Sequence, residues 1–242
     1  MKIADIIANT IDRLPTDHVF TYTDFNVDVS KKDAVVKALN RMVSSGKISK
    51  LSKGKFYKPR QSRFGSLKPS AYQIAKDLLE QDGEIIGYIT GYNAYNDMGL
   101  TNQIPSALQI GTNKPRRAVK RGMYKISFIV QPNKITKSNI ELLRILDAMR
   151  FVREIPGTTP DDACTRLISI VGQLTQEQTK TLAKLVLQYS PVVRALCGAI
   201  LEHLDIGEDL IKKIANSLNP VTEYKVPVSV SVLPNKTKWR IK

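Results

Sequence analysis

The stretch that decides the fold is SKKDAVVKALNRMVSSGKISKLSKGKFYK, residues 30–58. Its first half predicts a helix, because apolar residues recur there at helical spacing. They are Val35, Ala38, Leu39, Met42 and Val43. Ser30 and Asp33 have the spacing of a capping box, so we expect Ser30 to cap this helix. Gly46 stands where helices commonly end in a left-handed residue.

The second half of the stretch predicts a short, lysine-rich hairpin. Residues 47–51 alternate between polar and apolar, residues 52–55 have turn composition, and Phe56 begins the return strand. A helix with one apolar face followed by such a hairpin is typical of a winged helix-turn-helix. In that fold the helix enters the major groove of DNA and the hairpin forms the wing. An amphipathic helix over residues 3–14 and a brief helix around residues 22–26 would complete the domain.

The charge distribution supports DNA as a partner. From Lys31 to Arg63 the sequence has eleven Lys or Arg residues and one acid, which gives a net charge of +10 out of +15 for the 242 residues. Duplex DNA attracts such a segment because each neutralised phosphate releases a counterion. The alternative interpretation is a solvated basic face.

Two sets of residues are predicted to contact DNA. Lys37 and Asn40 would read base edges, and Val36 would touch a thymine methyl group. The other residues of the predicted interface would hold phosphates without reading sequence. They are Lys31, Lys32, Arg41, Lys50, Lys53 and Lys55.

A second basic cluster follows later in the chain. It consists of Lys114, Arg116, Arg117, Lys120 and Arg121, within a region from Met98 to Ile140 that has no acid. Three interpretations stay open for it. The cluster is a further phosphate or RNA surface, a docking face for an acidic partner, or a solvated loop between strands.

The predicted fold class is α+β. Residues 1–60 would form the winged helix-turn-helix domain, and residues 61–69 a basic linker or an ordered strap. A larger, mostly helical C-terminal domain would span residues 70–242, with strands within 70–135, helices over 138–219 and terminal strands over 224–242.

No residue pattern in the sequence calls for catalysis, a metal or a cofactor. Zinc spacing, a P-loop and a nucleophile elbow are all absent. Asp161 and Asp162 suggest a metal pair, but Thr159-Pro160-Asp161 fits a helix start better. Without a membrane-length apolar run or a signal peptide, we expect a cytoplasmic protein with Cys164 and Cys197 as buried thiols.

A series of short motifs resembles a known family. They are GKFYKP at 54–59, FGSLKPS at 64–70, GYNAYNDMGLTNQIP at 91–105, RALCGA at 194–199 and SLNP at 217–220. In this order they look like the AbiEi-type antitoxins of bacterial type IV toxin–antitoxin systems, which act in abortive infection, a form of phage defence. The match spans nearly the whole chain.

The resemblance implies a repressor and antitoxin rather than an enzyme. The N-terminal domain would repress its own operon at inverted repeats, and the C-terminal domain would counter a nucleotidyltransferase toxin encoded beside it, directly or indirectly. The family supplies no catalytic residues to carry over. The alternative is a protein-interaction module that binds the toxin directly, with DNA binding secondary.

Overall fold

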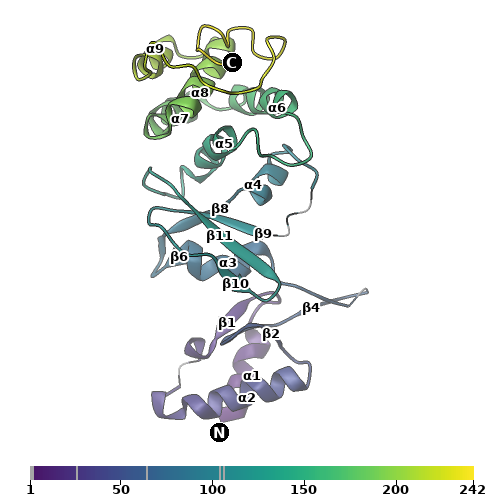
Figure 1. Ribbon diagram of the computed structural model, residues 1–242. Coiled ribbons are helices and arrows are strands. Elements are labelled where there is room, and N and C mark those ends of the chain that lie inside the picture. The colour runs from purple at the N-terminus through teal and green to yellow at the C-terminus, as the bar shows by residue number, and fades with distance from the viewer. Residues whose placement is uncertain (1–2, 26, 64, 104, 106) are drawn as a thin grey trace. The chain divides into compact units, whose positions relative to one another are not determined.

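The computed structural model describes the chain except for residues 1–2, 26, 64, 104 and 106 (Figure 1). The chain forms two compact units, and neither is continuous in sequence. The first consists of residues 1–77 and 119–124, and the second of residues 78–118 and 125–242. Helices and strands are mixed, and the C-terminal region is helical, which confirms the predicted α+β class.

The first unit surrounds a small core between helices and a sheet. Its elements are α1 (Ile3–Arg13), β1 (Val19–Thr21), η1 (Tyr22–Asp24), η2 (Val29–Lys31), α2 (Lys32–Ser44), β2 (Ser49–Ser52) and β3 (Lys55–Tyr57). Within the described residues β3 lies between β1 and β2 and is antiparallel to both. Apolar side chains of α1, α2 and the sheet meet in the core, among them Ile7, Phe20, Leu39 and Phe56.

Helix α2 ends as predicted but begins differently. Gly46 has a φ of 76°, and the N–H groups of Gly46 and Lys47 donate to the carbonyls of Val43 and Met42, both at 3.0 Å. This is a Schellman stop. The predicted Ser30 cap is wrong, because Ser30 lies within the 3₁₀ turn η2 and α2 starts at Lys32, with Lys31 as its N-cap and no side-chain cap. The N–H and the hydroxyl of Ser30 instead donate to the Asp28 carboxylate, at 2.8 and 2.7 Å.

Two other segments of this unit are more compact than expected. The brief helix predicted over 22–26 is a single 3₁₀ turn, η1, with a capping box between Thr21 and Asp24; Asn26 lies outside the described residues. The predicted linker at 61–69 contributes to an antiparallel hairpin of β4 (Arg60–Ser62) and β5 (Gly65–Leu67). Gly65, the first residue of β5, has a φ of 104°. The described residues of this segment are thus ordered, in keeping with the strap interpretation.

Helix α3 (Ala71–Leu79) matches the helix expected after residue 70, and β10 (Val119–Arg121) belongs to the segment that returns to the first unit. After α3, β6 (Glu80–Gln81) and β7 (Glu84–Ile85) form a tight hairpin. Its two turn residues, Asp82 and Gly83, both have positive φ, at 52° and 81°. This is the type I′ geometry that an Asp-Gly pair favours.

A sheet occupies the first part of the second unit. Strand β9 (Ala107–Thr112) pairs antiparallel with β8 (Gly87–Thr90) and parallel with β11 (Tyr124–Val130). Short helix α4 (Tyr92–Asp97) follows β8 directly. The expectation of strands within residues 70–135 is thus confirmed for the described residues, which do not include Ser106.

The helices predicted over 138–219 are confirmed. They are α5 (Ile140–Arg150), α6 (Pro160–Gly172), α7 (Gln176–Leu185), η3 (Val186–Gln188), α8 (Pro191–His203) and α9 (Glu208–Asn216). Thr159 caps α6 by accepting from the Asp162 N–H at 3.1 Å, so the helix-start interpretation of Asp161 is correct. Cys164 and Cys197 are buried free thiols, and burial raises the pKa of each to about 12.

The terminal strands predicted at 224–242 are wrong. The part of this segment that the structure describes has turns and an isolated bridge between Tyr224 and Ile241. Val226 and Val228 are buried in the helical core, whereas Val230 is 61% exposed, so burial with a period of two ends after Val228. An extended segment packed on helices can bury alternate residues over a short stretch as a strand does, but no neighbouring strand is needed.

Candidate nucleic-acid interface

The predicted base-reading residues lie together on the exposed side of α2. Lys37, Asn40 and Arg41 are exposed and line a shallow open depression with Ser44 and Ser45. Val35, Ala38 and Leu39 face the core on the opposite side of the same helix. Val36 is half-buried between these faces. Amphipathic spacing therefore both anchors α2 and presents its polar face to solvent.

The cations of this face are free to meet an external anion. Within the described ranges, no acidic group lies at ion-pair distance from Lys31, Lys37 or Arg41. Lys32 is also exposed, and its ammonium lies 4.5 Å from the centroid of the Tyr22 ring. That cation–π contact leaves the charge available, because an aromatic face does not neutralise it.

The β2–β3 hairpin carries two further exposed cations. Lys50 lies on β2, and Lys53 stands at the turn beside Gly54, which has a φ of 74°. A positive φ at this turn favours glycine and keeps the hairpin tight. The two lysines thus extend the basic face of α2 with a short basic hairpin.

Lys55 was expected to hold a phosphate, but its ammonium pairs with an acid of the protein. Its ammonium lies 2.6 Å from the carboxylate of Asp77 on α3, and its side chain is only 20% exposed. We therefore no longer expect Lys55 to contact a phosphate. The partner is 22 positions away in the sequence, on a helix that the hairpin pattern does not reveal.

Arg121 of the second basic cluster is likewise paired with Asp77. The arginine is 8% exposed, and its guanidinium donates to both Asp77 carboxylate oxygens, at 2.5 and 2.7 Å, and to the Ile74 carbonyl at 2.6 Å. Partial burial opposes ionisation of Asp77, but the hydrogen bonds from Arg121 and Lys55 outweigh it and lower the pKa of Asp77. Arg121 therefore holds the first unit together rather than facing solvent.

The other four residues of the cluster are exposed, but they belong to different units. Lys114, Arg116 and Arg117 belong to the second unit, whereas Lys120 belongs to the first. Arg116 stacks over the Phe128 ring at 5.8 Å. With Arg121 buried, four of the five residues are exposed.

Two exposed cations of the β4–β5 hairpin are absent from the predicted DNA contacts. Arg60 lies on β4, and Arg63 lies in the turn that follows it. Both residues contribute to the net charge of +10 over residues 31–63. A linker, however, would not hold them at a fixed position. Arg60, Gln61 and Ser62 are all polar, so no alternation of polar and apolar residues marks this strand in the sequence.

The described part of the chain has no cluster of three or more His, Cys, Asp or Glu side chains suited to a metal ion. Among the described helices, none combines the length and the apolar character needed to cross a membrane.

Residues 6–181 match a family of unknown function, DUF6088. The chain belongs to the DUF6088 family. The matched residues run from α1 into α7, so they include most of the first unit and the sheet of the second. Comparison with curated proteins finds no match.

This DUF6088 chain is also similar to a solved structure, the RV2827C protein from Mycobacterium tuberculosis. The TM-score is 0.51 at 12% sequence identity, and the match covers 90% of this chain and 82% of the other. At that identity the likeness shows a shared fold and nothing about activity.

Proposed function

We propose that this protein is a non-enzymatic binder of double-stranded DNA and that its first unit is a winged helix-turn-helix. Support comes from the order α1, β1, η1, α2, β2, β3 and from the central position of β3 in the sheet. Helix α2 would lie in the major groove, and the β2–β3 hairpin would contact the backbone as the wing.

The observation that carries the proposal is the exposed face of α2. Asn40 lies one helical turn beyond Lys37 and next to Arg41, and no described acid neutralises these cations. An amide can pair with the N6 and N7 edge of adenine, and an ammonium suits guanine O6 and N7. Lys31, Lys32, Lys50 and Lys53 would hold phosphates around these base contacts.

We further propose an antitoxin role, supported by the ordered motifs that resemble AbiEi-type antitoxins. The protein would repress its own operon, and its second unit would counter a nucleotidyltransferase toxin. The competing proposal is direct toxin binding with DNA binding secondary. Co-purification of the neighbouring gene product with a variant that has lost DNA binding, such as Lys37→Ala combined with Arg41→Ala, favours direct binding.

DNA binding is tested with the full-length protein. DNA from just upstream of its own gene is compared with random duplex of equal length at two salt concentrations. A preference of about a thousandfold that survives physiological salt supports a specific operator. Equal affinities that both vanish as salt rises would contradict sequence-specific recognition.

Asn40→Ala is expected to relax sequence specificity. Loss of one amide contact should cost roughly 1–3 kcal/mol on the operator and little on random DNA, since phosphate contacts are untouched. Binding to a set of operators with single base-pair changes measures this. Equal losses on operator and random DNA would remove Asn40 from the base-reading residues.

Lys53→Ala is expected to weaken binding to every duplex alike. The slope of log K against log salt should become shallower by about one, because one phosphate contact is lost. Lys55→Ala is the matched control on the same hairpin, since its ammonium already pairs with Asp77. Titrations at four salt concentrations compare the two slopes. A larger change for Lys55 than for Lys53 would refute this assignment of the hairpin lysines.

A further inference from the structure

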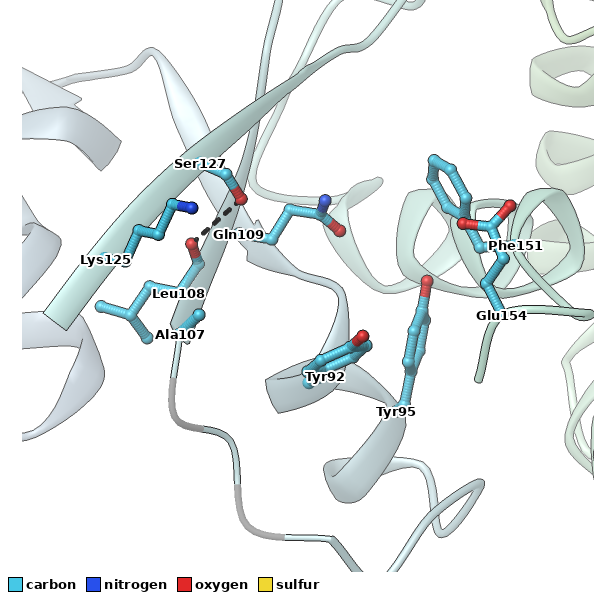
Figure 2. A pocket seen from close by; sticks show the side chains of 9 residues that line it. All are labelled: Tyr92, Tyr95, Ala107, Leu108, Gln109, Lys125, Ser127, Phe151 and Glu154. Atoms are coloured by element: carbon cyan, nitrogen blue, oxygen red, sulfur yellow. Dashed lines mark hydrogen bonds between the residues drawn. The ribbon is translucent and has the colours of Figure 1, made fainter. Parts of the chain in front are cut away.

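A cavity of about 290 Å³ lies in the second unit, between the sheet and the helices that follow it (Figure 2). Its volume is close to the roughly 300 Å³ at which small-molecule sites begin. The side chains that matter to its chemistry are Tyr92, Tyr95, Gln109, Lys125, Phe151 and Glu154. They come from α4, β9, β11 and the turn after α5.

Aromatic rings form one side of the cavity. Tyr92 and Tyr95 project from α4 with ring centroids 6.2 Å apart and an interplanar angle of 52°. Tyr95 is buried, whereas Tyr92 is 45% exposed, and Phe151 adds a third ring (Figure 2). An exposed tyrosine ring at the mouth of a cavity offers a flat face on which another planar group can stack.

An amide faces these rings. Figure 2 shows Gln109 extending from β9 toward the space that the rings surround. Within the described ranges its amide has no hydrogen-bond partner. Gly91, which has a φ of 64°, leaves room for this amide; a Cβ at Gly91 would lie 2.5 Å from the Gln109 Oε1. A side chain at position 91 would therefore displace the amide.

Charged groups of opposite sign also line the cavity. Lys125 and Glu154 are exposed, and neither has an ion-pair partner among the residues that the structure describes. A purely apolar ligand would use none of these groups. A ligand with a flat face, an edge of donors and acceptors, and polar substituents would use the rings, the amide and the charges together.

We propose that this cavity binds a nucleobase, stacked on Tyr92 with its edge hydrogen-bonded to Gln109. Nucleobases combine a flat π-face with an edge that a primary amide complements in two directions. The base would come from a free nucleoside or nucleotide, or from an unpaired position of single-stranded RNA. The proposal goes beyond duplex DNA binding and does not depend on it, since α2 belongs to the other unit.

The test uses the full-length protein and equilibrium dialysis with adenosine, guanosine, cytidine and uridine. These nucleosides have no phosphate, so the basic face of the first unit does not attract them. Saturable binding of at least one nucleoside is expected. Gln109→Leu and Tyr92→Ala should each weaken it about tenfold, whereas Tyr92→Phe should retain it because the stacking face remains. Gln173→Leu, at an exposed glutamine directly after α6, is the matched control.

Competition identifies the source of the base. Displacement of the nucleoside by a mononucleotide or by a single-stranded tetraribonucleotide supports the proposal. The competitor that binds more tightly identifies the natural source of the base. Absence of saturable binding by any nucleoside, mononucleotide or tetraribonucleotide overturns it. Unchanged binding in Gln109→Leu and Tyr92→Ala also overturns it, because the base would then lie elsewhere.

Discussion

Gly198→Ala is expected to destabilise the helical part of the second unit by about 3 kcal/mol, at the upper end of the usual cost of overpacking. A Cβ at this position of α8 would lie 2.1 and 2.2 Å from ring atoms of Trp239, far inside van der Waals contact. The ring has no simple way to move. It is 4% exposed, and its Nε1–H donates to the Glu202 carboxylate at 2.8 Å. We expect segment 224–242 to detach from α8.

Gly172→Ala is the matched control for this prediction. Gly172 also lies in a helix, α6, but its Cβ would meet Leu204 at an ordinary 3.5 Å. Alanine there should be neutral or stabilise by up to about 1 kcal/mol, because it lowers the entropy of the unfolded chain. Trp239 is the only tryptophan of the chain, so its fluorescence in urea reports on this region directly. Equal midpoints for the two variants would contradict the steric argument.

Asp147→Ala is expected to cost about 4 kcal/mol, because it leaves several buried hydroxyl groups without an acceptor. Asp147 is fully buried in α5. Its carboxylate accepts from the hydroxyls of Tyr88 at 2.6 Å, Thr90 at 2.9 Å and Tyr189 at 2.9 Å. These bonds connect the sheet of the second unit to its helices, so both parts should loosen together.

Tyr88→Phe and Asp147→Asn separate the parts of this effect. Tyr88→Phe removes one donor and should cost about 1–2 kcal/mol, well below the alanine variant.

Burial raises the pKa of Asp147, although the hydrogen bonds from Tyr88, Thr90 and Tyr189 oppose this. The folded state then binds the proton more tightly than the unfolded chain. The contribution of Asp147 to stability should therefore fall as pH rises from about 4 through the raised pKa.

Urea unfolding of wild type and Asp147→Asn at several pH values tests this sign. The asparagine variant should lack the decline that Asp147 adds to the wild-type profile. A wild-type stability that rises relative to Asp147→Asn over this pH range would mean that the hydroxyl donors outweigh burial and that the pKa is lowered.

Local signals in the sequence predict most of the helices and strands. The apolar stripe of α2, Gly46 at its end, and the proline that begins α6 each act within a few residues, and all three features lie where expected. The Ser30 cap fails for a local reason as well, since Ser30 belongs to a 3₁₀ turn and donates to Asp28. The sequence shows that Asp28 is close to Ser30, but it does not show that a 3₁₀ turn precedes the helix.

Features that depend on distant residues could not be predicted. Lys55 and Arg121 resemble other surface cations until α3 brings Asp77 between them. The valines near the C-terminus are spaced as in a strand, but Val226 and Val228 are buried against helices and Val230 is exposed. Likewise Tyr92 and Gln109 become neighbours of one cavity only when α4 lies beside β9, and no spacing in the sequence records that contact.

The return of residues 119–124 to the first unit has a consequence for synthesis on the ribosome. Chains emerge from the N-terminus at about 5–20 residues per second, and domains usually fold as they emerge. Here the first unit lacks the guanidinium that neutralises Asp77 until β9 and the following loop have also been made. A nascent chain that ends at residue 77 therefore lacks the bonds from Arg121 to Asp77 and to the Ile74 carbonyl, and only an elongated chain can complete the first unit.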